Sequence, residues 1–283
     1  PMKSTPGKKS AASRVVSNSA TNNGGGIFND QGTVFLAAST VAANRAQSGG
    51  GLYNTGASAV VTMVDNSQVR ENVAATFGGG LNNSGGMVML DHSGILSNVL
   101  TIQGVTSQGG GVYSSGGAMT ITNNSLIQNN ATGNDEGAGA GIFVASGAVT
   151  VEDSAFLFND PGRGGAIYRA NGALAITDSC IVGNSDTAID ASQPVTATGN
   201  WWGHASGPAG AGPGVGDSVS SNVNFTGFLG TAILGCPTFA DPDLAIAKTV
   251  TPTTGVPGGA ITYTLNFSNT GQRFAHVIVI SDS

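Results

Sequence analysis

A six-residue pattern, Ser-x-(Val/Ile/Phe)-x-x-Asn, occurs seven times in this chain and constrains its fold more than any other feature. Its asparagines are Asn18, Asn44, Asn72, Asn98, Asn130, Asn159 and Asn184. A second pattern, Gly-Gly-Gly-aliphatic-aromatic in its fullest form, alternates with the first. It begins at Gly24, Gly49, Gly78, Gly109, Gly139 and Gly164, in steps of 25, 29, 31, 30 and 25 residues. A recurring period of this size is typical of a solenoid, in which each repeat is a unit stacked on its neighbours.

Each repeat contains three short β-type runs separated by Gly, Ser, Asn or Asp, for example 141–144, 148–151 and 155–158. No window has convincing helical periodicity. Three strands per turn predict an all-β parallel β-helix in which like residues stack about 4.8 Å apart. We place the aliphatic residue of each serine motif inside, and the asparagine in the following turn, where stacked amides form an internal ladder. The glycines mark another corner, where a positive φ or tight packing excludes a Cβ atom.

The residue that follows the inward aliphatic of the glycine motif is usually aromatic. These residues are Phe28, Tyr53, Tyr113, Phe143 and Tyr168, with Asn82 at the same position of one repeat. Strand alternation turns them outward, so we expect an aromatic stripe on the surface. Rings in a row can stack on sugars or pack against a neighbouring protein. The alternative is a stripe covered by the chain's own loops or turned inward over the glycines.

Carboxylates gather just before the repeated serine, at Asp65, Asp91, Asp153 and Asp178. Those of adjacent coils would lie about 5 Å apart, the separation that retaining glycosidases use. These are also turn positions, where Asp and Asn are favoured for local hydrogen bonds. The pattern therefore favours turn chemistry, with a Ca²⁺ site and a catalytic pair as the alternatives. No other metal or cofactor is expected.

The composition bounds the class of protein. The chain has 283 residues, 9% of them charged, and a net charge of −6. This balance argues against nucleic acid, which requires basic stripes. Low charge with abundant Asn, Ser, Thr and Gly fits a secreted bacterial β-protein, and no apolar run approaches the roughly 20 residues of a membrane span. Because Pro1 opens the chain, we expect a mature or trimmed form.

The repeats extend over about 13–203, followed by a cap over about 200–235, so residues 1–236 form the β-helix domain. Trp201 and Trp202 are expected to help cover its open core. Cys180 and Cys236 either form a surface disulfide or are two unrelated thiols. Residues 237–283 are a linker and alternating strands, at 261–267 and 276–282, that read as an Ig-like sandwich. An Ig-like domain has about 100 residues, so this one is incomplete and needs strands from a longer chain or from a neighbouring subunit.

The paired serine and glycine motifs resemble right-handed β-helix repeats of the pectate-lyase-like superfamily, particularly those of bacterial surface proteins and the chlamydial polymorphic outer-membrane proteins. The segment from Asp243 resembles an Ig-like repeat found in tandem on bacterial and archaeal cell surfaces. The resemblance implies a right-handed parallel β-helix with a C-terminal partial Ig-like sandwich, located outside the cell in an adhesive or structural role. Polysaccharide lyases and hydrolases share the superfamily, so fold alone does not decide the activity.

We therefore expect a non-enzymatic protein, secreted or on the bacterial cell surface, that acts through its solenoid surface as an adhesin, stalk or fibre component. Its expected partners are other surface proteins, glycans or copies of itself, including assembly by strand complementation. The alternative is a carbohydrate-active β-helix enzyme, either a polysaccharide lyase or a glycoside hydrolase.

Overall fold

The computed structural model describes residues 12–101, 107–133, 137–162, 164–233, 235–237, 244–251, 254–255 and 258–269. Within these ranges all the regular secondary structure is β-strand. The described residues contain no helix that is long and apolar enough to cross a membrane. The chain divides into two units, Pro1–Pro237 and Thr238–Ser283.

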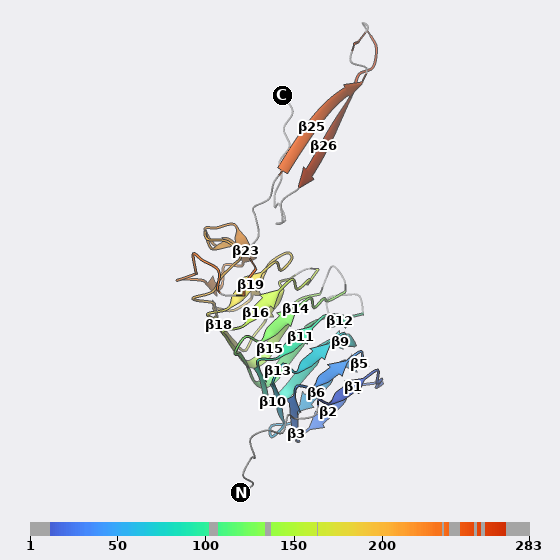
Figure 1. The fold of residues 1–283 in the computed structure, drawn as a ribbon, viewed down its shortest axis with the longest axis vertical. Coiled ribbons are helices and arrows are strands. Elements are labelled where there is room, and N and C mark those ends of the chain that lie inside the picture. The colour runs from blue at the N-terminus through green and yellow to red at the C-terminus, as the bar shows by residue number, and fades with distance from the viewer. Residues whose placement is uncertain are drawn as a thin grey trace. The chain divides into compact units, whose positions relative to one another are not determined.

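The first unit is a parallel β-solenoid, as the repeats predict (Figure 1). Its first sheet has, among the described residues, seven strands. In order they are β1 (Arg14–Val16), β4 (Thr40–Ala42), β8 (Gln68–Arg70), β11 (Gly94–Leu96), β14 (Leu126–Gln128), β16 (Ala155–Leu157) and β19 (Cys180–Val182). The motif residues Val15, Val41 and Val69 pair in register from coil to coil. Each sequence repeat is therefore one coil, and equivalent residues stack on one another.

In the second sheet, the strands of the main path begin, in the repeats, at the aliphatic residue of each glycine motif. Its path is β2 (Ile27–Asp30), β6 (Leu52–Thr55), β10 (Leu81–Asp91), β13 (Val112–Thr122), β15 (Ile142–Glu152), β17 (Ile167–Arg169), β20 (Ile189–Ala191), β23 (Gly216–Val219) and β22 (Pro208–Gly210). The long strands bend midway. The second half of β10 pairs with β7 (Val60–Val64), which in turn pairs with β3 (Thr33–Ala37). The second half of β15 pairs with β18 (Ala173–Thr177), followed by β21 (Val195–Thr196) and β24 (Val223–Asn224). A third sheet contains β5 (Arg45–Ser48), β9 (Val73–Phe77) and β12 (Val99–Leu100).

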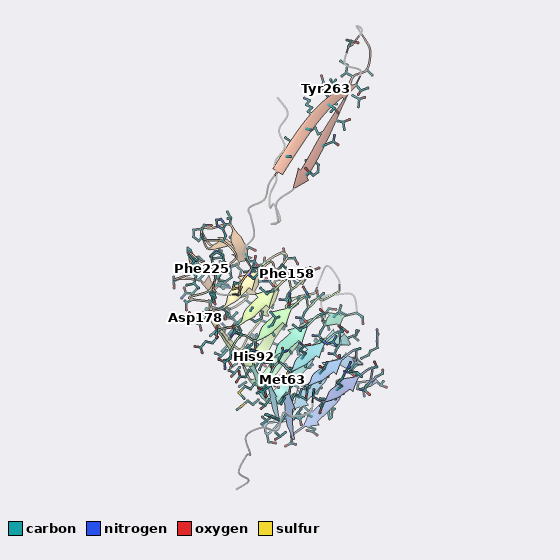
Figure 2. The ribbon with its side chains drawn as sticks, in the orientation of Figure 1. Met63, His92, Phe158, Asp178, Phe225 and Tyr263 are labelled. Carbon is teal, nitrogen blue, oxygen red and sulfur yellow. A yellow bond between two sulfur atoms is a disulfide. The ribbon has the colours of Figure 1, made fainter. Side chains whose placement is uncertain are left out.

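A continuous core of aliphatic side chains fills the coils, and Met63 marks its place among the side chains in Figure 2. Val69, Ile95, Ile127 and Phe156, all from serine motifs, are fully buried. Burying an aliphatic side chain of this size stabilises the fold by about 1.5–3 kcal/mol. Because each coil contributes only a few such residues, the coils depend on stacking for stability.

A left-handed bend precedes every ladder asparagine. The residues that form it are Ser17, Ala43, Glu71, Ser97, Asn129, Phe158 and Gly183, with φ between 53° and 72°. This conformation costs a non-glycine L-residue about 1–2 kcal/mol. Because six of these seven residues are not glycine, the stacked coils impose the bend, and residue type does not reveal it.

The glycine motif fits against the asparagine motif. Gly49 has a φ of +61°, and a Cβ atom there would lie 2.5 Å from the carbonyl oxygen of Leu52. A Cβ atom on Gly51, the third glycine of the same motif, would lie 2.8 Å from Nδ2 of Asn72 in the next coil. The two recurring patterns of the sequence are thus two sides of one close contact inside the solenoid.

The C-terminal end of the solenoid is covered. Trp202 is fully buried as part of the core, and Phe225 and Phe228 pack against that core. Trp201 is also buried, and its Nε1 donates a hydrogen bond to the carbonyl oxygen of Pro237 at 3.4 Å. The tryptophans therefore lie where a cap was expected.

The second unit contains an antiparallel pair, β25 (Leu244–Thr251) and β26 (Thr262–Asn269). Ile246 pairs with Phe267, and Val250 pairs with Tyr263, which places these apolar side chains on one face. Lys248 lies over the ring of Tyr263, 4.5 Å from its centroid. The predicted strand at 276–282 lies outside the described residues, so the Ig-like sandwich stays a prediction.

Candidate functional site

Three of the four predicted Ca²⁺ candidates occupy strained turn positions. Asp65, Asp153 and Asp178 have φ values of 55°, 45° and 48°, in the left-handed region that Asp and Asn tolerate better than most residues. Asp91, at the end of β10, accepts a hydrogen bond from Nδ2 of Asn123 at 2.8 Å. In the described part of the chain, no three His, Cys, Asp or Glu side chains are grouped so that they could hold a metal ion. The geometry favours turn chemistry, and Ca²⁺ binding stays a hypothesis.

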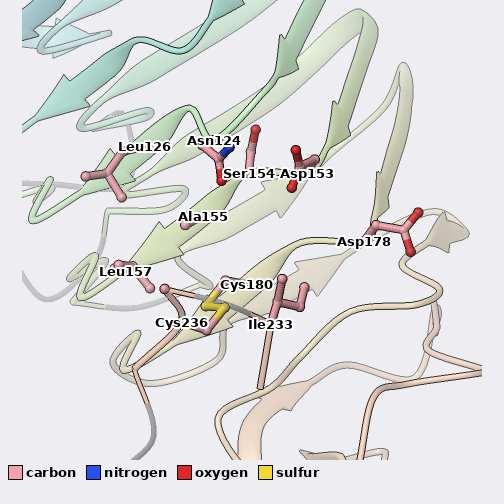
Figure 3. Close-up of a pocket in the computed structure, with 11 residues that line it drawn as sticks. Asn124, Leu126, Asp153, Ser154, Ala155, Leu157, Asp178, Cys180, Ile233 and Cys236 are labelled. Atoms are coloured by element: carbon pink, nitrogen blue, oxygen red, sulfur yellow. A yellow bond between two sulfur atoms is a disulfide. The ribbon is translucent and has the colours of Figure 1, made fainter. Parts of the chain in front are cut away.

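A groove of about 250 Å³ lies beside two of these carboxylates on the outer face of the first sheet (Figure 3). Asp153 and Asp178 line it together with the apolar side chains of Leu126 and Leu157. Its other side is the segment that carries Cys236, which is disulfide-bonded to Cys180 with a Cα–Cα distance of 5.9 Å. The disulfide therefore holds the end of the first unit against β19 and helps to form the groove.

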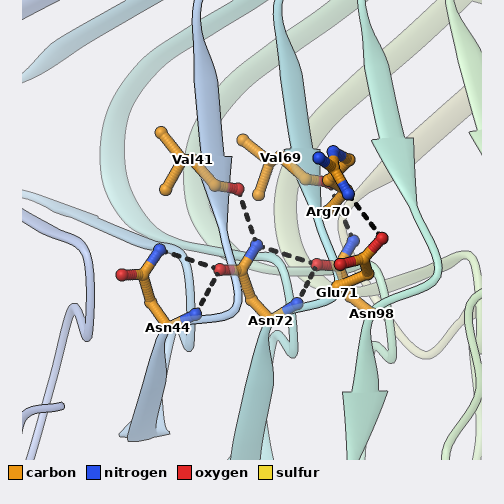
Figure 4. A network of polar contacts seen from close by, with 7 residues as sticks. All are labelled: Val41, Asn44, Val69, Arg70, Glu71, Asn72 and Asn98. Atoms are coloured by element: carbon orange, nitrogen blue, oxygen red, sulfur yellow. Dashed lines mark hydrogen bonds and ion pairs between the residues drawn. The ribbon is translucent and has the colours of Figure 1, made fainter. Parts of the chain in front are cut away.

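The motif asparagines form a ladder through the solenoid interior (Figure 4). The backbone N–H and Nδ2 of Asn72 both donate to Oδ1 of Asn98, at 2.9 and 3.0 Å, and Nδ2 also donates to the carbonyl oxygen of Val41. The same pair of bonds joins every neighbouring couple from Asn18 to Asn184, at 2.9–3.1 Å. Asn18, in the first coil, is exposed, and all the later members are buried. The ion pair of Arg70 and Glu71 lies on the surface beside this ladder.

Asp217 ends the asparagine ladder at the C-terminal side, and nothing in the repeats predicts it. Its carboxylate accepts hydrogen bonds from the backbone N–H of Gly183, and from the backbone N–H and Nδ2 of Asn184, at 2.9–3.1 Å. A carboxylate thus replaces the amide oxygen that an eighth motif asparagine would supply.

The motif serines form a second, partial ladder. The backbone N–H of Ser39 donates to Oγ of Ser67 at 3.0 Å, and similar bonds join other neighbouring coils. At the C-terminal end, Oδ1 of Asn200 replaces the serine oxygen and accepts from the N–H of Ser179 at 2.9 Å. Asn200 comes immediately before the tryptophan pair, so the cap segment also terminates this ladder.

A third ladder connects Asn29, Asn54 and Asn83 in the second sheet. Nδ2 of Asn29 donates to Oδ1 of Asn54 at 2.7 Å, and Nδ2 of Asn54 donates to Oδ1 of Asn83 at 2.9 Å. Ser114 takes the next position, and its buried Oγ has no hydrogen-bond partner among the residues that the structure describes. The signal was present in the sequence, because each of these asparagines lies two residues after the aliphatic residue of its glycine motif.

The aromatic stripe is a stack of rings along the solenoid. Ring centroids lie 5.7 Å apart for Phe28 and Tyr53, and 5.6 and 5.1 Å apart along Tyr113, Phe143 and Tyr168, with planes inclined by 16–25°. In this arrangement the ring faces contact one another, so that mainly edges meet the solvent. Phe28 at the free end is 53% exposed, whereas Phe143 is only 5% exposed. Stacking on a sugar would require faces that this packing already uses.

Asn82 interrupts the stack, and Phe77 compensates for it. Asn82 pairs with both Tyr53 and Tyr113 but is only 3% exposed. The ring of Phe77 lies 4.7 Å from that of Tyr113. Burial, and to a smaller extent the neighbouring Tyr53, raises the pKa of Tyr113 above its ordinary value of 10.0.

The sequence reasoning missed an exposed apolar patch on the outer face of the second sheet. We call Phe35, Val60, Met87 and Met89 the apolar patch; Phe35 is 65% exposed, Met87 54% and Met89 37%. Residues in register with Phe35 and Met89 are Thr62, Thr120 and Thr150, and those in register with Met87 include Ala118 and Ala148. The column of positions in register with Met89 and the column in register with Met87 both point outward, and neither contains a charged residue from β3 to β15. The signal was the apolar residue at alternate, outward positions of β3 and β10.

A shallow depression of about 680 Å³ adjoins this patch where the long strands bend. Val60 and Met87 line it together with Gly86, Gly117 and Ala118. A Cβ atom on Gly117 would lie 1.9 Å from the carbonyl oxygen of Gly86, so packing of neighbouring coils excludes side chains there. The depression is therefore uncharged, and it lies next to the exposed methionines of the apolar patch.

Comparisons of the chain with protein-family models, with curated proteins and with solved structures found no match.

Proposed function

We propose that this protein is a structural or adhesive protein that acts through the outer surface of its solenoid, secreted or displayed on a bacterial cell. The observation that carries the proposal is the apolar patch on an uncharged sheet face. Large apolar side chains on a soluble surface mark contact sites when they gather in a patch. Methionine adapts its shape to a partner, which suits a surface that binds proteins.

The interior supports a mechanical role. The asparagine ladder and a continuous core order every coil relative to the next, and the serine ladder and the third ladder add bonds between some of the coils, so the outer face is a fixed platform. A rigid platform loses little conformational entropy on binding. The absence of charge on the two outward columns favours a protein surface over an acidic or basic ligand as the partner. In this proposal the C-terminal unit belongs to an Ig-like repeat of a stalk, and the solenoid to the right-handed pectate-lyase-like class.

The test replaces the apolar patch with residues that the same columns already contain. Phe35→Thr, Met89→Thr and Met87→Ala together convert the patch to the Thr and Ala found in register with it. Binding of the labelled protein to immobilised copies of itself, to whole bacterial cells and to a glycan array is then measured. We expect binding to proteins or cells to be lost in the triple variant and kept in Thr150→Ala, a control on the same face. Equal binding by the triple variant and the unaltered protein would remove the patch from consideration.

The groove beside Asp153 and Asp178 supports a second candidate, a carbohydrate-active enzyme. Two carboxylates from neighbouring coils next to an apolar floor could hold and cleave a sugar chain. Reducing-end and unsaturated-product assays on plant and bacterial polysaccharides test this candidate. Activity that disappears in Asp153→Asn and Asp178→Asn would replace the adhesive proposal with an enzymatic one.

A further inference from the structure

The three ladders share one direction, and this gives the two ends of the solenoid different chemistry. In each ladder an N–H group donates toward the C-terminal side, to a side-chain oxygen of the next coil. The third ladder stops in the third coil, where Nδ2 of Asn83 donates to the carbonyl oxygen of Gly116. At the C-terminal end of the solenoid the asparagine and serine ladders finish on acceptors, Asp217 and Asn200. The donors are therefore satisfied at that end.

The N-terminal face of the first coil presents the complementary set of acceptors. Oγ of Ser13, Oδ1 of Asn18 and Oδ1 of Asn29 are the first oxygens of their ladders. In later coils the corresponding oxygens of Ser39, Asn44 and Asn54 each accept an N–H from the preceding coil. Among the described residues, no N–H donates to the three oxygens of the first coil.

Apolar side chains between these oxygens are also partly uncovered. Val15, Ile27 and Val34 are only partly buried, whereas their partners in the second coil, Val41, Leu52 and Val61, are fully buried. We call the surface formed by β1, β2 and β3 the N-terminal face. It presents the same pattern of ladder oxygens and aliphatic side chains as the coil–coil contacts that follow it.

We propose that the N-terminal face docks one further parallel β-coil of the same repeat. The N–H groups of that coil donate to Ser13, Asn18 and Asn29, and its aliphatic side chains cover Val15, Ile27 and Val34. Parallel strands added to an exposed edge bind through backbone hydrogen bonds, and the side-chain pockets give specificity.

Other occupants fit less well. The C-terminal end of a second copy is closed by Asp217 and Asn200, and two N-terminal faces would bring ladder acceptors against acceptors. Residues 1–12 contain no copy of the motif and are fewer than half of the 25 residues in the shortest glycine-motif step. The occupant must therefore be a full coil whose donor side is free.

The experiment supplies such a coil. Residues 13–38 are duplicated in tandem before Ser13 in the full chain, which preserves the 26-residue spacing of Ser13 and Ser39. We expect the urea midpoint to rise and the backbone amides of the original β1 and β2 to become protected from hydrogen exchange. The decisive readout is Asn18→Ala, introduced at the original position. It should shift the urea midpoint little in the 283-residue chain, and by as much as Asn98→Ala in the extended chain.

A matched control carries Asn→Ala at the ladder position of the added coil, which removes its side-chain donor but not its strands. This control should keep only part of the rise in midpoint. An added coil that is cleaved by protease while the original coils stay intact, with the same Asn18→Ala shift in both chains, would overturn the proposal. A dimer of the 283-residue chain that dissociates on Val15→Asp would also overturn it, because the occupant would then be a second copy.

Discussion

Replacing Asn98 by Ala tests whether the asparagine ladder stabilises the solenoid. Asn98 is fully buried, and its Oδ1 accepts from the backbone N–H and Nδ2 of Asn72, while its Nδ2 donates to Val69 and Asn130. The substitution leaves two buried donors of Asn72 without their acceptor. Each unsatisfied buried group costs about 1–3 kcal/mol, so for two such groups we expect the free energy of unfolding to fall by about 2–6 kcal/mol.

The assay is urea unfolding of the whole chain, followed by circular dichroism, with the slope of the transition compared between variants. Asn18→Ala is the matched control, because Asn18 is exposed and Oδ1 of Asn44 keeps the backbone donor of residue 18. The control should cost less than about 1 kcal/mol, as expected for one exposed hydrogen bond. Equal losses in the two variants would refute the reasoning, since the ladder would then contribute no more inside than at its end.

Three further predictions concern the turns, the ladder end and the stripe. Ala43→Gly should raise the free energy of unfolding by about 0.5–1 kcal/mol, because Ala43 has a φ of 54°, which strains alanine but not glycine. The control Ala118→Gly in strand β13 should lower the free energy of unfolding by a similar amount, and urea midpoints that fall in both variants would contradict this. Asp217→Ala should cost about 2–4 kcal/mol by removing the acceptor of three N–H groups, and Asp217→Asn, which keeps one acceptor oxygen, should cost less in thermal unfolding. Because the pKa of Tyr113 is raised above 10.0, the unfolded chain loses that proton first, so stability should fall as pH rises from 10 through the folded pKa. Tyr113→Phe should abolish this part of the fall, and unchanged curves of stability against pH would disprove the shift.

Much of the solenoid could be predicted because the residues that recur in the sequence are the ones that stack on their equivalents in the next coil. The positions of Val69 and Asn72 follow from spacing alone, since every coil repeats the same contact. The Cα–Cα distance of Cys180 and Cys236 could not be predicted, because it depends on how the cap returns along the outer face. Spacing suggested the aromatic stripe, but not that its rings would stack face to face.

The features that escaped prediction occur where periodicity is lost. Asp217 has no counterpart in the repeats, and only the fold brings its carboxylate to Asn184. Phe77 comes from a different strand than the stripe and lies against Tyr113 because Asn82 leaves room for it. The left-handed bend at Glu71 could not be predicted from the sequence, because the stacking of the coils imposes it and the preference of the residue does not.

The common direction of the asparagine amides has an electrostatic consequence. Each side-chain amide is a dipole with its N–H end toward the C-terminal side, and the aligned dipoles add along the stack as peptide dipoles add in an α-helix. The stack therefore carries partial positive charge where it ends at Asn184, the place where an anion is stabilised. The carboxylate of Asp217 occupies that place. It acts on the ladder as an acidic capping residue acts on the N-terminus of a helix, and a ladder of the opposite direction would need a cation there instead.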